Sequence, residues 1–256
     1  MKSLLPALFL ITSLSLPLLA NAGNEAILNS ILQKHMEAMG GLRNWSQVES
    51  IRLTGKIERN EQIVDLVIIK KRPNQIRATV TVPLPGTEDQ AIQVIRAHNG
   101  QSAWTATRRA GAPDMTPTEL IGDEADSLLS EAGVLPPLIK LWRSGEKLTF
   151  AGSSPFNGEQ AFVIEHQHKS KNKQQRFYLS VETYRTLAYE SKTPTESTLT
   201  TLGHYQQQDG ILIPTQSTVT SQTTGVSKMN MSSIEIGVGI YDEYFETSAQ
   251  SERAEL

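Results

Sequence analysis

A helical pattern of apolar residues occupies positions 24–39. The residues recur every three or four positions, which predicts one amphipathic helix with a buried stripe of Ile27, Leu28, Ile31, Leu32, Met36 and Met39. Asn24 is a suitable N-cap, and Gly40 with Gly41 can end the helix. We expect the stripe to pack against a sheet.

Beyond this helix the pattern changes to the alternation of apolar and polar residues that is typical of strands. Turn signals such as Asn99-Gly100 and Asp209-Gly210 join several of these segments as hairpins. The predicted strands cover residues 48–58, 63–71, 75–82, 91–98, 101–107, 147–151, 160–167, 174–180, 185–191, 197–206, 211–219 and 226–237. The sequence therefore predicts an α+β protein in which one antiparallel sheet of about eleven to twelve strands curls into an open or a closed barrel.

A different segment, residues 113–143, interrupts the strands with apolar residues at helical spacing. Glycines and the pair Pro136-Pro137 break it, so it predicts one or two helices, over residues 116–130 and 136–142. This insert could be structural cover for the sheet or a mobile lid over a cavity. The pattern alone leaves both interpretations open.

The corner between the second and third predicted strands carries a basic cluster. Pro73 cannot donate to a strand ladder, so the earlier strand must end there. Alternation resumes after the break and places four apolar side chains on one face, namely Ile76, Ala78, Val80 and Val82. From the residues alone, the favoured role of Lys70, Lys71 and Arg72 is to keep an exposed corner soluble.

Residues 1–22 have the features of a secretory signal peptide. A cation and a leucine-rich run precede Ala20-Asn21-Ala22, which matches a cleavage site. We expect cleavage before Gly23, a globular domain over residues 23–246 and a disordered polar tail over residues 247–256. An uncleaved membrane anchor is the disfavoured alternative. The mature protein should be exported and soluble.

Composition narrows the possible functions. The formal net charge is −3, which gives no electrostatic reason to expect nucleic acid as a partner. The chain has no cysteine, so it carries no disulfide, no thiol nucleophile and no Cys-ligated zinc. The sequence also lacks the glycine-rich motifs of nucleotide-binding proteins and of serine hydrolases. We expect no cofactor.

Two histidines offer the one candidate for metal or hydrolytic chemistry. His166 and His168 lie two apart on a predicted strand, so they share a face and could bind a metal together with a carboxylate. The pattern indicates no third ligand, and the flanking Lys and Gln residues favour a solvated strand face. A hydrolase that uses these histidines is the least favoured function, and we expect no enzyme.

A sheet with apolar residues on both faces can either pack solid or keep a cavity for an apolar ligand. The candidate cavity residues are mostly aliphatic, which suits an acyl chain: Leu53, Ile76, Val80, Trp104, Leu138 and Trp142. A carrier of such chains needs a cavity of more than roughly 300 Å³.

Two motifs resemble the LolA-like family of periplasmic lipoprotein carriers. A predicted strand ends in Lys71-Arg72-Pro73-Asn74, and a later hairpin reads Asn99-Gly100-Gln101-Ser102-Ala103-Trp104. The order of helix, strands, helical insert and strands is also similar to that family. The resemblance implies an unclosed barrel with a helical lid, in which Arg72 bonds to the lid backbone and holds it closed. It further places Ile76 and Ala78 at positions that face the cavity.

The resemblance also implies a function. We expect a periplasmic carrier or binding protein for lipid or for the acyl chains of a lipoprotein, with an inner-membrane transporter or an outer-membrane acceptor as candidate partners. The family also contains envelope sensors, so the alternative is an interaction module whose groove binds a protein segment.

Overall fold

One antiparallel sheet dominates the computed structural model, which describes residues 18–84, 86, 90–111, 116–168 and 173–247, with side chains from Gly23 onward. Within these residues the sheet has 13 strands in the order β6-β5-β4-β3-β2-β1-β13-β12-β11-β10-β9-β8-β7. The strands are β1 (Ser50–Arg59), β2 (Gln62–Lys71), β3 (Gln75–Pro83), β4 (Ala91–His98), β5 (Ala103–Arg109), β6 (Thr118–Leu120), β7 (Leu148–Phe156), β8 (Glu159–His168), β9 (Lys173–Ser180), β10 (Thr186–Lys192), β11 (Ser197–Gln208), β12 (Ile211–Ser221) and β13 (Gly225–Ile236).

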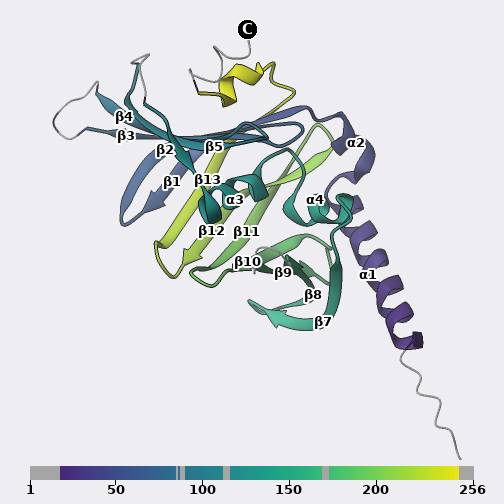
Figure 1. Ribbon diagram of the computed structural model, residues 1–256. Helices are drawn as coiled ribbons and strands as arrows, with labels where there is room; N and C mark the ends of the chain where they lie inside the picture. Colours follow the sequence, from purple (N-terminus) through teal and green to yellow (C-terminus); the bar gives the residue numbers. More distant parts are fainter. Residues whose placement is uncertain (1–17, 85, 87–89, 112–115, 169–172, 248–256) are drawn as a thin grey trace, which may run out of the picture.

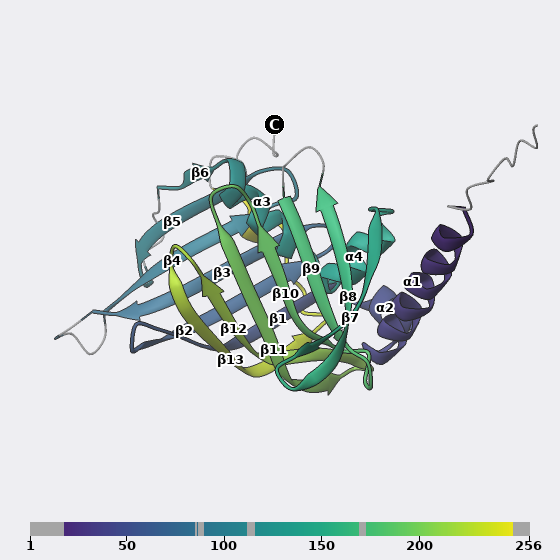
Figure 2. The same ribbon diagram turned by 90° about the horizontal axis from the view of Figure 1, so that it is seen from below.

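The sheet curls without closing. Its two edge strands, β6 and β7, follow one another in the sequence but do not pair, and the insert connects them. The layer of β1 to β5 lies over the layer of β7 to β12, with the insert helices between them (Figure 1). Figure 2 shows the two layers from below, crossing at an angle. The predicted open antiparallel barrel is confirmed, with one strand more than expected.

Four α-helices and one 3₁₀-helix accompany the sheet in the described residues: α1 (Leu18–Ala38), α2 (Gly41–Gln47), α3 (Gly122–Glu131), α4 (Pro137–Arg143) and η1 (Asp242–Phe245). The stripe of α1 is buried except at Ile27, which is 47% exposed. None of the described helices is both long enough and apolar enough to cross a membrane.

Three helices differ from the sequence-based expectation. Helix α1 begins at Leu18, so Asn24 lies inside it and is not its N-cap. Gly40 and Gly41 were expected to end the helical region, but Gly40 adopts φ 111° and turns the chain into a second helix, α2. Only glycine fits at Gly40, because an added Cβ would lie 2.3 Å from the Gly210 carbonyl oxygen. The helix expected over residues 116–130 begins only at Gly122, since Thr118–Leu120 pairs with β5 as strand β6.

Two large apolar clusters hold these layers together. The first joins α1 and α2 to β1, β12, β13 and the insert, around Trp45, Ile51 and Ile139. The second joins α1 and α4 to β8 and β9, around Leu32, Leu138 and Phe177. Helix α4 contributes to both, so it is fixed between the halves of the sheet.

The predicted end segments are only partly described. Of the proposed signal peptide, residues 1–17 lie outside the described residues, and residues 18–22 belong to α1. Of the tail expected to be disordered, residues 248–256 also lie outside them, whereas Thr247 is buried at 8% exposure.

Candidate functional site

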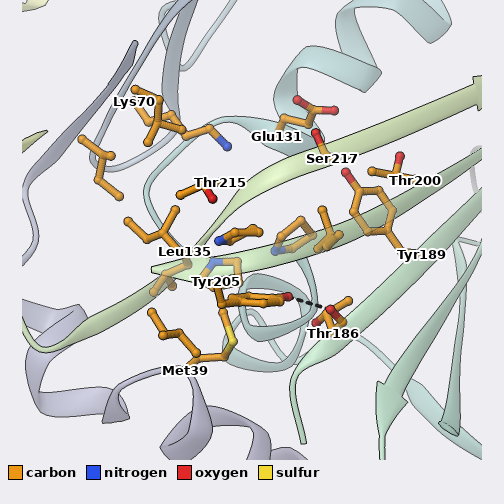
Figure 3. Close-up of a pocket in the computed structure, with 18 of the residues that line it drawn as sticks. Met39, Lys70, Glu131, Leu135, Thr186, Tyr189, Thr200, Tyr205, Thr215 and Ser217 are labelled. Atoms are coloured by element: carbon orange, nitrogen blue, oxygen red, sulfur yellow. Dashed lines mark hydrogen bonds between the residues drawn. The ribbon is translucent and has the colours of Figure 1, made fainter. Parts of the chain in front are cut away.

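A cavity of about 190 Å³ lies on the concave face of the sheet, beneath the insert (Figure 3). It is bounded by β1, β2 and β9 to β13 on the sheet side, and by α2 and the insert on the other. Most of its lining is aliphatic or aromatic: Met39, Trp45, Ile51, Leu53, Ile68, Val134, Leu135, Leu138, Phe177, Leu202, Ile213, Val219, Met229 and Met231.

Strand alternation explains why these side chains meet. Leu53 of β1 pairs with Ile68 of β2, and paired residues in an antiparallel sheet point to the same face. The intervening residues face away from the cavity. On β13 the flexible side chains Met229 and Met231 reach the cavity, beside a bulge at Thr54 and Gly55 of β1. Methionines adapt to ligands of irregular shape.

Two of the predicted cavity residues, Leu53 and Leu138, line the cavity. Ile76, Ala78 and Val80 do not line the cavity. They nevertheless lie on the same face of the sheet as its lining, as the pairing of Ala78 with Ile68 across β2 and β3 shows. These three therefore extend the concave surface away from the cavity. Trp142 packs at the border of the two apolar clusters and is also absent from the lining.

The prediction for Trp104 was wrong. Trp104 pairs with Ala97, which pairs with Arg77, and this row faces the convex side of the sheet. There the side chain is 2% exposed, and its indole Nε1 donates to the Phe245 carbonyl at 2.9 Å. Strand alternation could have excluded Trp104, since it has the opposite parity to Ile76 in the paired register. The C-terminal segment that covers it could not be foreseen.

The cavity is also smaller than the roughly 300 Å³ that a carrier was expected to need. At about 190 Å³ it holds only part of a long acyl chain while the insert is in place. Any larger ligand therefore requires the insert to move.

Helix α3 covers the concave surface of β3, β4 and β5 beside the cavity. None of its residues is buried, and its side chains reach both layers of the sheet through polar contacts. Glu124 meets Arg96 of β4 at 3.4 Å, and Asp123 accepts from Thr195, in the β10–β11 turn, at 3.1 Å. Exposed polar contacts of this kind contribute about 0–1 kcal/mol each.

Lys140 of α4 fixes the C-terminal end of α3. Its ammonium donates to the carbonyls of Leu129 at 2.7 Å and of Ala132 at 2.9 Å, at the end of the helix, where carbonyls have few backbone partners. Gly133 follows, and its N–H donates to the Gln75 carbonyl at 3.2 Å. Burial, together with the nearby charge of Lys70, lowers the pKa of Lys140 to about 8.

Arg72 does bond to backbone carbonyls, but not to those of the insert, so its predicted role as a latch on the insert was wrong. Its Nε donates to Val48 and its Nη2 to Trp45, both at 2.7 Å. These carbonyls lie at and just beyond the end of α2, a helix that the sequence did not predict. A helix end leaves carbonyls without partners, and the five donors of a guanidinium can satisfy several. Arg72 therefore joins α2 to the β2–β3 corner.

The end of the cavity beneath α3 is polar. Lys70 of β2 and Glu131 of α3 both lie there, and Tyr189, Thr200 and Ser217 lie nearby (Figure 3). Burial lowers the pKa of Lys70, and the charge of Glu131 partly offsets this effect. Burial likewise raises the pKa of Tyr189, so its hydroxyl remains a hydrogen-bond donor at neutral pH.

His166 is buried at 3% exposure, which contradicts the expected solvated strand face. Its Nε2 lies 3.1 Å from a Glu146 carboxylate oxygen, and its Nδ1 lies 3.1 Å from the Gln175 side-chain oxygen. The ring of His168 lies 6.1 Å away. No group of three or more His, Asp or Glu side chains suited to a metal occurs among the described residues.

Solved structures of other proteins share this architecture. A LolA superfamily protein from Nitrosomonas europaea aligns with a TM-score of 0.54 and 12% identity over 86% of this chain and 98% of that chain. This chain has a LolA-like fold. A putative outer membrane lipoprotein-sorting protein domain from Vibrio parahaemolyticus aligns with a TM-score of 0.53 and 15% identity over 85% of this chain and 95% of that chain.

A DUF1329 family protein from Desulfovibrio piger also aligns, with a TM-score of 0.55 and 12% identity over 86% of this chain and 98% of that chain. No protein-family model and no curated protein matches the sequence. The resemblance that the two sequence motifs indicated is thus confirmed at the level of the fold.

Proposed function

We propose that this protein is a periplasmic carrier or binding protein that holds an acyl chain, from a lipid or a lipoprotein, in the cavity beneath its insert. The observation that supports this most is a largely apolar cavity, with three methionines in its wall, next to a cover of the concave surface, α3, that buries none of its own residues. A cover with so little apolar anchoring can move aside at low cost.

Displacement of α3 would enlarge the available apolar surface. The concave residues next to the cavity, Ile76, Ala78 and Val80, continue its lining toward β4, where Val94 is 36% exposed. A chain too long for about 190 Å³ could then extend along this row. In this account, Ile76, Ala78 and Val80 contact the ligand only when α3 has moved. The role needs no catalytic group and no cofactor.

The proposed location in the periplasm is based on the predicted signal peptide. Residues 1–22 are proposed to direct export and to be removed before Gly23, which would leave the protein free in the periplasm. N-terminal sequencing of the exported protein checks this, since an intact leader would contradict it. An inner-membrane transporter and an outer-membrane acceptor are the partners that such a carrier would serve.

Native mass spectrometry of the protein exported by its own cell tests the proposal. We expect a bound lipid that Leu53→Glu abolishes, because an unpaired charge in this cavity costs several kcal/mol. Ile63→Glu is the matched control, since Ile63 lies on β2 and is 61% exposed. Circular dichroism should show both variants folded.

The proposal would be overturned if the wild-type protein carried no lipid and also failed to bind a fluorescent acyl probe. So would a folded Leu53→Glu variant that retains its lipid. A peptide bound in place of lipid, and lost in the Leu53 variant, would favour the alternative of a groove for a protein segment.

A further inference from the structure

The cavity contains one lysine, Lys70, in an otherwise largely apolar wall. Its ammonium forms no hydrogen bond and no ion pair with another described residue, apart from a longer-range attraction to Glu131. A charged group in apolar surroundings is costly unless it has a partner. The fold nevertheless places this cation on the concave face, where its neighbours in the β2 row are the apolar residues Val64, Leu66 and Ile68.

Glu131 is a weak partner for Lys70. Its side chain belongs to α3 and is exposed, so water screens its charge. The other nearby cation, Lys140, already donates to the two carbonyls at the end of α3. Lys140 also lies outside the cavity lining, so Lys70 is the one basic residue among the described residues that line the cavity.

Polar side chains line both ends of the cavity, but its charged residues, Lys70 and Glu131, lie at one of them. Tyr189, Thr200 and Ser217 lie at the same end as Lys70 (Figure 3). Met39, Thr186 and Tyr205 lie at the other end, where the Tyr205 hydroxyl already donates to the Thr186 carbonyl at 2.6 Å. A hydroxyl can donate to an anion while an aliphatic wall receives a hydrocarbon chain. The cavity is thus amphipathic, with its positive charge at the end that α3 covers.

From this arrangement we propose that the ligand is a single-chain amphiphile with a monoanionic head, a long-chain fatty acid, whose carboxylate binds Lys70 and whose chain runs toward Met39. This proposal rests on the proposed function, because it names the ligand of the same cavity. Glu131 then acts as a stand-in for the ligand's carboxylate. It lies at the Lys70 end of the cavity when the cavity is empty and leaves with α3 when the ligand enters.

The charges of the site favour one negative charge on the ligand. A neutral head would leave Lys70 without a partner, and a cationic head would be repelled by Lys70 and Lys140. A carboxylate on Lys70 forms a charge-assisted hydrogen bond, which is about twice as strong as a neutral one.

Competitive displacement of the neutral probe N-phenyl-1-naphthylamine tests the proposal. Dodecanoate, dodecanol and dodecyltrimethylammonium have the same chain and different heads. For the wild-type protein we expect dodecanoate to bind about tenfold more tightly than dodecanol. Lys70→Met should make the two affinities equal, and Glu131→Gln should widen the preference for dodecanoate. Lys71→Met is the control, because Lys71 points to the opposite face and pairs with Asp242 at 2.5 Å.

Each outcome separates this proposal from the more general one. Equal wild-type affinities, tighter binding of dodecanol, or a preference that survives in Lys70→Met would overturn the fatty-acid proposal and leave an acyl-chain carrier intact. Failure of the probe and of all three amphiphiles to bind would overturn both.

Discussion

The two helices of the insert are neighbours in the chain but differ in how the protein holds them. Helix α4 buries Leu138 and Ile139, each at 1% exposure, and joins both apolar clusters. Helix α3 buries nothing and is held by Lys140 and by polar contacts at its surface. Because apolar burial dominates stability, α4 belongs to the core, and α3 is the cover that we propose to be displaced. Of the two roles that the sequence pattern left open, α4 is structural cover, and the mobile lid remains the proposal for α3.

The largest expected effect is the loss of the α4 anchor. Leu138→Ala should lower the free energy of unfolding by about 2–5 kcal/mol, because it opens a hole in a packed cluster. Leu128→Ala, its counterpart on α3, should cost about 1 kcal/mol or less, since Leu128 is only partly buried. Urea denaturation measures both, and equal costs would remove the distinction between the helices.

Acid should lower the free energy of unfolding through His35, which belongs to the buried stripe side of the fold and not to α3. His35 of α1 is 0% exposed, and burial lowers its pKa to about 4. Between pH 6.5 and 4, His35 is protonated in the unfolded chain but remains neutral in the folded protein. The free energy of unfolding therefore falls as the pH falls through this range. The loss should approach roughly 3 kcal/mol. His35→Gln should remove this part of the pH dependence in urea titrations, and an unchanged slope would contradict the assignment.

The junction between α3 and α4 should tolerate no side chain. Gly133 has φ 77°, and an added Cβ would lie 2.6 Å from the Pro73 carbonyl oxygen. Gly145 has φ 76° with open space around it, so it is a matched control. Both changes to alanine incur strain from positive φ, but Gly133→Ala should cost about 1–3 kcal/mol more in thermal unfolding. Equal costs would mean that the junction can shift.

The smallest expected effect is confined to α3. Lys140→Met removes two hydrogen bonds from the end of this helix, so its amides should exchange about tenfold faster with solvent. The amides of α4 should be unaffected. Uniform acceleration across the insert would show that the two helices open together.

Alkaline pH should also change the hydrogen-exchange protection of α3, through Lys140. The pKa of Lys140 is about 8 in the closed protein and near 10.4 for a solvated lysine. As the pH rises through this window, Lys140 loses its proton in the closed protein before it would in a state with α3 displaced. The closed state then no longer carries the cost of burying an ammonium group, and the neutral amine still donates hydrogen bonds. After correction for intrinsic exchange, α3 protection should therefore rise with pH in the wild type. Lys140→Met should lose this component of the rise.

Strand alternation allowed much of the fold to be predicted, together with the two cavity residues Leu53 and Leu138. It failed where a segment distant in sequence supplied the cover or the partner. Trp104 was assigned to the cavity although its parity in the paired register is opposite to that of Ile76, and nothing local indicates that Phe245 covers it on the convex face. Arg72 was assigned to the insert on the family resemblance, and the helix end that it caps was not predicted because Gly40 and Gly41 were expected to end the helical region. Lys140 was missed for a similar reason, since its carbonyl partners are defined only by where α3 ends.

The central claim is that α3 must move for the cavity to load, and a cross-link across α3 tests it most directly. Asp123 and Thr195 are in contact across the mouth of the barrel, and the natural chain has no cysteine. Asp123→Cys combined with Thr195→Cys, joined by a short bismaleimide, should block uptake of N-phenyl-1-naphthylamine, whereas the uncoupled double variant should load as the wild type does. Equal uptake with α3 cross-linked would contradict the account.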